Sequence, residues 1–146
     1  MKIVVISNSA APSKNASSLQ TAKLCEALYK IGHQVNLILP NTGYKDKDYF
    51  KFYDIKDKFM IKRIKYFNKF PIGLNYYFYS LISILKSDYK KQDLYITRNF
   101  FTSFLLCVLN KKHILEVHDD ISIEGRIVRF IIKYFKYFNN KNIIKI

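Results

Sequence analysis

The segments Tyr95-Ile-Thr-Arg98 and Ile114-Leu-Glu-Val-His118-Asp-Asp120 decide the fold of this chain. They belong to two short apolar runs, Asp93–Thr97 and His113–Val117, which are separated by a helix-like apolar block at Phe100–Leu109. This order predicts a βαβ unit with parallel strands. In open parallel sheets, ligands bind in the crevice outside the carboxyl ends of the strands. The sequence therefore indicates a site at the polar residues around the two strand ends: Arg98, Glu116, His118 and Asp119.

Strand patterns recur along the rest of the chain. Lys2–Ser7 is dense in Ile and Val, which is typical of a central strand buried on both faces of a parallel sheet. His33–Leu39 predicts a second strand, and Phe59–Tyr66, where apolar and basic residues alternate, predicts a third near the sheet edge. A last strand begins in Asn142–Ile146. Strands that alternate with helices predict an α/β fold with a mainly parallel sheet between two helical layers.

Helix signals lie between these strands. Ser17 or Ser18 is placed to cap a helix that runs through Ile31, and Gly32 then ends it. Tyr44–Lys58 has no clear period, so we expect a long loop there with a helical turn at most. Two further helices are predicted at Asn75–Lys86 and Ile123–Phe138. The expected apolar side of the last helix comprises Ile127, Phe130, Ile131, Tyr134 and Phe138.

Length and charge limit the classes of function. The 146 residues, 49% of them hydrophobic, are enough for one domain with its own core, spanning 1–146. Lys and Arg number 25 against 11 Asp and Glu, so the net charge is 25 − 11 = +14, which attracts anions in general. The excess is mostly Lys, and no nucleic-acid-binding motif is present, so we expect no nucleic-acid partner. Compositional bias alone is an equally good explanation of the charge.

The chain contains no apolar run of about 18 residues or more, so we expect a cytoplasmic protein that contacts a membrane only peripherally, at its inner face. Cys25 and Cys107 lie within apolar helical patterns, which predicts buried free thiols. They also lack the spacing of a zinc site, and we expect neither a metal nor a cofactor.

The order of these segments resembles the N-terminal domain of glycosyltransferase family 4, whose members are GT-B enzymes. The most specific pieces are Leu28-Tyr-Lys-Ile-Gly32-His33-Gln-Val35, which is similar to the family's L-x-x-x-G-H-x-V helix exit, and the strand ends at Arg98 and at Glu116-Val-His118. The resemblance covers nearly the whole chain. It implies one Rossmann-like half of a GT-B fold, the half that holds the sugar acceptor.

In this family a C-terminal domain with a Glu-x(7)-Glu motif binds the nucleotide-sugar donor. No such domain follows here, so the resemblance implies a truncated or split half that reaches the donor only through a missing domain or a partner chain. It also implies that the residue matching His118 is catalytic and lies near the transferred sugar. A structural surface histidine is the alternative for His118.

The other site residues have open alternatives. Arg98 can hold an anionic acceptor group or pair with Glu116, and we expect Glu116 to be its structural partner. Asp119 can touch substrate or cap the next helix. The first loop, Asn8–Ser18, lacks the glycines of many family members. Three of its residues can still bind an anion at the helix start: Ser17, Ser18 and Lys14.

Two functions remain open at this point. The first is the acceptor side of a retaining glycosyltransferase that moves a hexose from a nucleotide sugar to a lipid-linked or polysaccharide acceptor and is inactive alone. The alternative is a non-catalytic, membrane-associated scaffold half that recruits a separate donor-domain chain. In either case an anionic membrane is expected to contact the basic and aromatic residues of Lys56–Phe70 and Arg126–Lys136.

Overall fold

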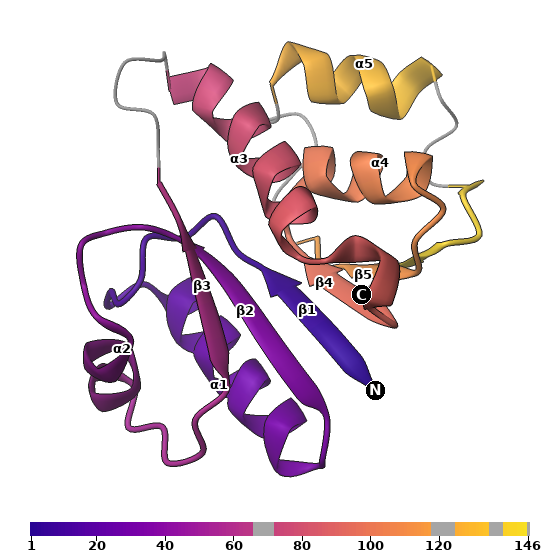
Figure 1. Cartoon of the computed structure of the whole chain (residues 1–146). Helices are drawn as coiled ribbons and strands as arrows, with labels where there is room; N and C mark the ends of the chain where they lie inside the picture. The colour runs from indigo at the N-terminus through magenta and orange to yellow at the C-terminus, as the bar shows by residue number, and fades with distance from the viewer. Residues whose placement is uncertain (66–71, 118–124, 135–138, 146) are drawn as a thin grey trace.

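Strand β1 (Lys2–Ile6) lies near the middle of a six-stranded, all-parallel sheet with the order β3-β2-β1-β4-β5-β6 (Figure 1). The computed structural model describes residues 1–65, 72–117, 125–134 and 139–145. This strand order, with helices in the connections, is that of a Rossmann-like α/β domain. The predicted central strand, edge strand and fold class are confirmed.

The remaining strands are β2 (Gln34–Pro40), β3 (Met60–Ile64), β4 (Leu94–Thr97), β5 (His113–Leu115) and β6 (Ile143–Lys145). The helices are α1 (Ala16–Lys30), α2 (Asp46–Phe52), α3 (Ile72–Lys86), α4 (Phe100–Val108) and α5 (Arg126–Tyr134), with a short 3₁₀ turn, η1 (Tyr89–Lys91), before β4. α1 and α2 cover one face of the sheet, and α3, α4 and α5 lie on the other (Figure 1).

The alternation of side chains along β1 joins the two halves of the core. Ile3 and Val5 belong to the hydrophobic cluster that includes residues of α1 and α2, whereas Val4 and Ile6 belong to the cluster that includes residues of α3 and α4. All four side chains are almost fully buried. Because successive residues of a strand point to opposite faces, a strand with apolar residues at every position has to be covered on both sides.

The start of α1 differs from the prediction. The N-cap is Asn15, and Ser17 and Ser18 lie inside the first turn rather than capping the helix. The end agrees with the prediction, since Gly32 follows the C-cap Ile31 with φ +89°, a conformation that glycine adopts without the steric cost of a Cβ.

The segment predicted as a loop contains helix α2. Asp46 and Asp48 lie in its first turn, where carboxylates interact favourably with the positive end of the helix dipole. Tyr49 and Phe50 are buried and pack edge-to-face at 5.8 Å between ring centroids. The aromatic residues of this segment therefore form core, and their short helix is stabilised by packing more than by its own periodicity.

The buried side of helix α5 overlaps only in part with the one predicted, since Ile131 is buried as expected but Ile127 and Phe130 are not. Val128 and Ile131 are buried, whereas Ile127 and Phe130 are 52% and 55% exposed. The prediction left out Val128, which packs in the cluster with Phe100 of α4. Of the predicted helix, residues 123–124 and 135–138 lie outside the described residues.

His113 is fully buried at the start of β5. Its Nδ1 lies 2.9 Å from the carbonyl oxygen of Lys111, which only accepts, so Nδ1 carries the proton and Nε2 accepts from the Ser103 hydroxyl at 2.5 Å. Burial lowers the pKa of His113, because it disfavours the charged imidazolium. Of the cysteines, Cys25 is buried and Cys107 half-buried, both are free thiols, and burial raises the pKa of Cys107 to about 11.

We predict that acid destabilises the fold through His113. The folded-state pKa lies below the unfolded value of about 6.5, so the unfolded chain binds more protons and stability falls as the pH drops below about 6.5. One such group changes the free energy of unfolding by at most about 1.4 kcal/mol per pH unit. Urea unfolding between pH 7 and 5 should show a smaller pH slope for His113→Gln than for the unaltered chain. Equal slopes would contradict the prediction.

Candidate functional site

The carboxyl ends of β4 and β5 bring Arg98 and Glu116 together. Thr97 and Leu115 are register partners, so the residues that follow them, Arg98 and Glu116, lie side by side. Arg98 Nε donates to Glu116 Oε2 at 2.6 Å, and both side chains are largely withdrawn from solvent. A charge-assisted bond of this length fixes the guanidinium at the strand ends. The structure thus contains the Arg98–Glu116 pair, one of the two alternatives considered for Arg98.

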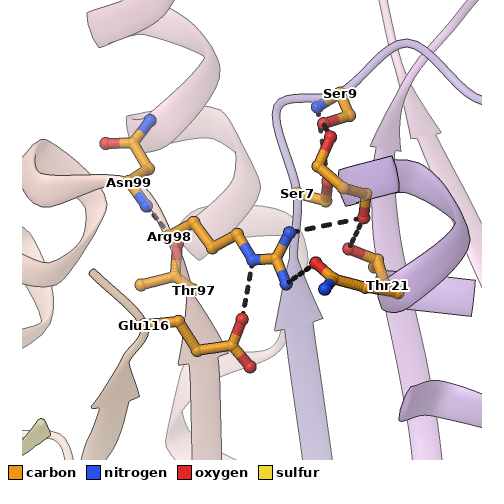
Figure 2. A network of polar contacts seen from close by, with 9 residues as sticks. Ser7, Ser9, Thr21, Thr97, Arg98, Asn99 and Glu116 are labelled. Atoms are coloured by element: carbon orange, nitrogen blue, oxygen red, sulfur yellow. Dashed lines mark hydrogen bonds and ion pairs between the residues drawn. The ribbon is translucent and has the colours of Figure 1, made fainter. Parts of the chain in front are cut away.

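Arg98 also reaches across the sheet edge to helix α1. Nη2 donates to Gln20 Oε1 at 3.1 Å, and Nη1 lies 3.4 Å from the carbonyl oxygen of Ser17 (Figure 2). The same carbonyl accepts from the Thr21 hydroxyl at 2.8 Å. One guanidinium therefore ties the ends of β4 and β5 to the first turns of α1.

The space next to this pair is small. A cavity of about 10 Å³ lies among Arg98, Glu116, Ser7, Thr21 and Thr97, together with aliphatic residues. This volume is about what one water molecule requires. A sugar cannot enter it, so a ligand that contacts Arg98 has to approach from the outer side of the sheet edge.

The glycine-free loop after β1 is held by side chains. Tyr53, at the end of α2, accepts from the Ser13 backbone N–H at 2.8 Å and donates to the Ser13 carbonyl oxygen at 2.9 Å. The Ala11 carbonyl oxygen accepts from Arg63 at 3.1 Å and from the Thr42 hydroxyl at 3.0 Å. The loop has no glycine, and these hydrogen bonds hold it on one defined path.

The three predicted anion-binding residues differ in accessibility. Ser18 is only 1% exposed, and its hydroxyl accepts from the Ser13 hydroxyl at 2.9 Å. Ser17 is half-buried, and its hydroxyl lies 3.2 Å from that of Ser9. Lys14 is exposed. Ser17 and Lys14 are therefore open to a ligand at the start of α1, whereas Ser18 is part of the support of the loop.

Two residues that the sequence reasoning missed belong to the same edge. Asn99 caps α4 by accepting from Thr102 N–H at 2.9 Å, and its amide donates to Ser80 at 3.1 Å, which fixes the residue after Arg98. Asn8 lies two residues beyond the end of β1, and its Oδ1 is buried without a hydrogen-bond partner among the described residues. The position of Asn8 after a central strand is the signal that could have identified it.

His118 and Asp119, the predicted catalytic and substrate-binding residues that follow Val117, lie outside the described residues. The carboxyl edge formed by Ser9, Ser17, Lys14, Arg98 and Glu116 is thus the described part of the candidate site. Within the described residues, no group of three or more His, Cys, Asp and Glu side chains could hold a metal ion. Nor is any helix in the described ranges long and apolar enough to cross a membrane.

A second hollow, of about 560 Å³, lies at the opposite edge of the sheet. Its lining includes Lys2, Lys58, Lys62 and Lys91 near the amino ends of the central strands. Lys62 donates to the Lys86 carbonyl oxygen at 3.1 Å, and Lys91 pairs with Asp88 at 3.3 Å. This hollow lies at the amino ends of the parallel strands, whereas ligands of open α/β sheets bind outside the carboxyl ends, so this edge is the weaker candidate.

Fold and site geometry together define a Rossmann-like α/β domain with a polar carboxyl edge. Neither a scan against models of known protein families nor a search of curated proteins finds a match to this chain. The resemblance to glycosyltransferase family 4 is therefore carried by the sequence motifs alone.

We predict that Arg98 and Glu116 are coupled in stability. A double-mutant cycle of Arg98→Met and Glu116→Gln should give a coupling energy of about 1 kcal/mol or more, above the range of exposed pairs, because both side chains are partly desolvated. The matched control is the exposed pair Lys91–Asp88, for which Lys91→Met and Asp88→Asn should give about 0.5 kcal/mol or less. Equal coupling energies in the two cycles would show that partial burial does not strengthen the Arg98–Glu116 pair.

Proposed function

We propose that this chain is the acceptor-side domain of a retaining glycosyltransferase that transfers a hexose from a nucleotide sugar to a lipid-linked or polysaccharide acceptor. The observation that carries the proposal is the convergence of polar groups from β1, α1, β4 and β5 at the carboxyl edge of the sheet. This edge is where ligands bind in open α/β sheets. The motifs at Gly32-His33 and at the ends of β4 and β5 add the family resemblance.

In this proposal each edge residue has a defined task. Glu116 and Gln20 hold the Arg98 guanidinium in place, so that its positive charge faces an anionic group of the acceptor. Ser17 and Lys14 offer a hydroxyl and an ammonium group at the start of α1, where the helix dipole also favours an anion. His118 follows β5 by three residues, and its imidazole or backbone N–H stabilises charge that develops near the transferred sugar.

The proposed reaction needs a second lobe. A sugar transfer requires donor and acceptor to be held in reacting geometry, and the cavity beside Arg98 and Glu116 has a volume of only about 10 Å³. The donor would be bound by another Rossmann-like domain that closes over this edge. Such a domain can be supplied by a longer polypeptide or by a partner chain.

The 146-residue polypeptide, purified by itself, should therefore transfer no sugar from UDP- or GDP-hexoses. Much of the rate enhancement of a sugar transfer comes from holding donor and acceptor in reacting geometry between two lobes. One lobe alone cannot hold both reactants in this way. Radiolabelled transfer assays with both nucleotide classes, at enzyme concentrations up to about those of the substrates, measure this. Turnover by the isolated polypeptide would overturn the proposal that a second domain has to bind the donor.

We predict that His118→Ala, in a protein that includes a donor domain, lowers turnover by roughly 100-fold or more, the scale of one lost transition-state interaction. The fold should persist, because a polar residue just beyond a strand end contributes little to the core. The matched control is His33→Ala at the entry to β2, which should leave turnover within about twofold. Equal turnover for both variants would assign His118 a structural role.

A non-catalytic scaffold is the second candidate function. It is favoured by the Arg98 guanidinium, which already has three protein partners, and by the small cavity beside it. The gene sequence beyond the codon for Ile146, and the neighbouring gene, distinguish the candidates. A Rossmann-like domain with Glu-x(7)-Glu in the same frame supports the enzyme, the same domain in the next gene supports a split enzyme, and its absence from both supports the scaffold.

A further inference from the structure

Helix α3 exposes a stripe of large apolar side chains. Leu74, Phe78, Leu81 and Leu85 follow each other at steps of four, three and four residues, which places them on one side of the helix. Their exposed fractions range from 40% to 61%. The opposite side of α3 supplies Tyr79 and Ile84 to the core. The stripe is therefore a second apolar side on a helix whose core-facing side is already complete.

The stripe continues onto α4 through a groove. The groove has a volume of about 180 Å³ and is lined by Tyr77, Phe78, Leu81, Phe101 and Leu105. At the end of α4, Val108 is 67% exposed. A contiguous exposed apolar surface on a single chain marks a site of interaction, whereas isolated exposed residues do not.

Helix α5, which packs on α4, adds positive charge to this side of the molecule (Figure 1). Its exposed residues are Arg126, Ile127, Arg129, Phe130 and Lys133, while Val128 and Ile131 are buried. Aromatic and aliphatic side chains thus alternate with cations on an exposed helix surface. This pattern is typical of helices that lie in the interface of an anionic membrane.

The two helical layers differ in charge. The sequences of α3, α4 and α5 contain no Asp or Glu, whereas α1 and α2 contain Glu26, Asp46 and Asp48. Two copies of this face would therefore bring cations against cations at Arg126 and Arg129, with no carboxylate from these helices between them. An anionic surface with an apolar interior is the partner that satisfies both parts of the face.

We propose that the α3–α5 face, defined by the exposed residues of α3, α4 and α5, docks the domain on an anionic lipid bilayer. The stripe of α3 and the α3–α4 groove enter the interfacial region, and Arg126, Arg129 and Lys133 contact lipid phosphates. This surface keeps the Arg126–Lys136 part of the one expected from sequence and has the stripe of α3 and the α3–α4 groove in place of Lys56–Phe70. In the described part of Lys56–Phe70, Phe59 is buried in the core and Arg63 pairs with Asp46 at 2.9 Å, so neither is free for lipid; residues 66–70 lie outside the described residues.

Cosedimentation of the full 146-residue chain with phosphatidylcholine vesicles, with and without phosphatidylglycerol, tests the proposal. Binding should require phosphatidylglycerol and weaken as salt increases. Arg126→Gln/Arg129→Gln should lower the partition coefficient roughly 25-fold, from about fivefold for each cation removed. Leu81→Asn/Leu85→Asn should lower it by roughly tenfold or more, because less apolar area enters the interface.

The controls make the same kinds of substitution, cation to Gln and apolar residue to Asn, on the other helical layer. Lys47→Gln/Lys51→Gln on α2 alters net charge equally, and Leu19→Asn/Ile31→Asn at α1 removes two apolar residues that are exposed to a similar extent. Both should bind like the unaltered chain, and near-UV circular dichroism of all four variants checks folding. Equal losses in controls and test variants would overturn the assigned face. Absence of binding to anionic vesicles, with a dimer in light scattering that Leu81→Asn/Leu85→Asn dissociates, would assign the face to a second copy instead.

Discussion

The structure depends on the burial of strand β1 between β2 and β4. Its residues Ile3 to Ile6 point alternately into the two clusters that hold α1 and α2 on one side and α3 and α4 on the other. A strand with apolar side chains on both faces is stable only if both helical layers form. Because β1 is paired in parallel on both edges, every neighbouring strand ends on the same side of the sheet. The polar edge is a consequence of this arrangement.

Much of the fold could be predicted because its signals are local. The dense Ile and Val content of β1, the glycine after α1 and the alternation in β3 each depend on a few neighbouring residues. The pairing of Arg98 with Glu116 was also predictable, because it requires only that β4 and β5 are adjacent and parallel. Sequence reasoning therefore predicted that Arg98 and Glu116 meet at the carboxyl edge of the sheet.

The remaining features depend on contacts between segments that are distant in sequence. Helix α2 is short, and the burial of Tyr49 and Phe50 against the other aromatic residues of its cluster stabilises it more than its own pattern does. The side of α5 that is buried follows from the position of α4, since Val128 packs with Phe100. The partners of Arg98 on α1 lie about 80 positions away in the chain. No local pattern contains this information.

The loop after β1 connects these distant segments to the site. In many dinucleotide-binding folds, glycines let this loop approach a phosphate closely. Here Tyr53 and Arg63 hold the loop, and they come from the end of α2 and from the edge strand β3. The path of the loop past Ser9 and Ser17 is thus determined by residues at the far edge of the sheet. A change that loosens β3 or α2 should therefore move the start of α1 and, through the Ser17 carbonyl, the Arg98 guanidinium, although neither element touches that arginine in the described network.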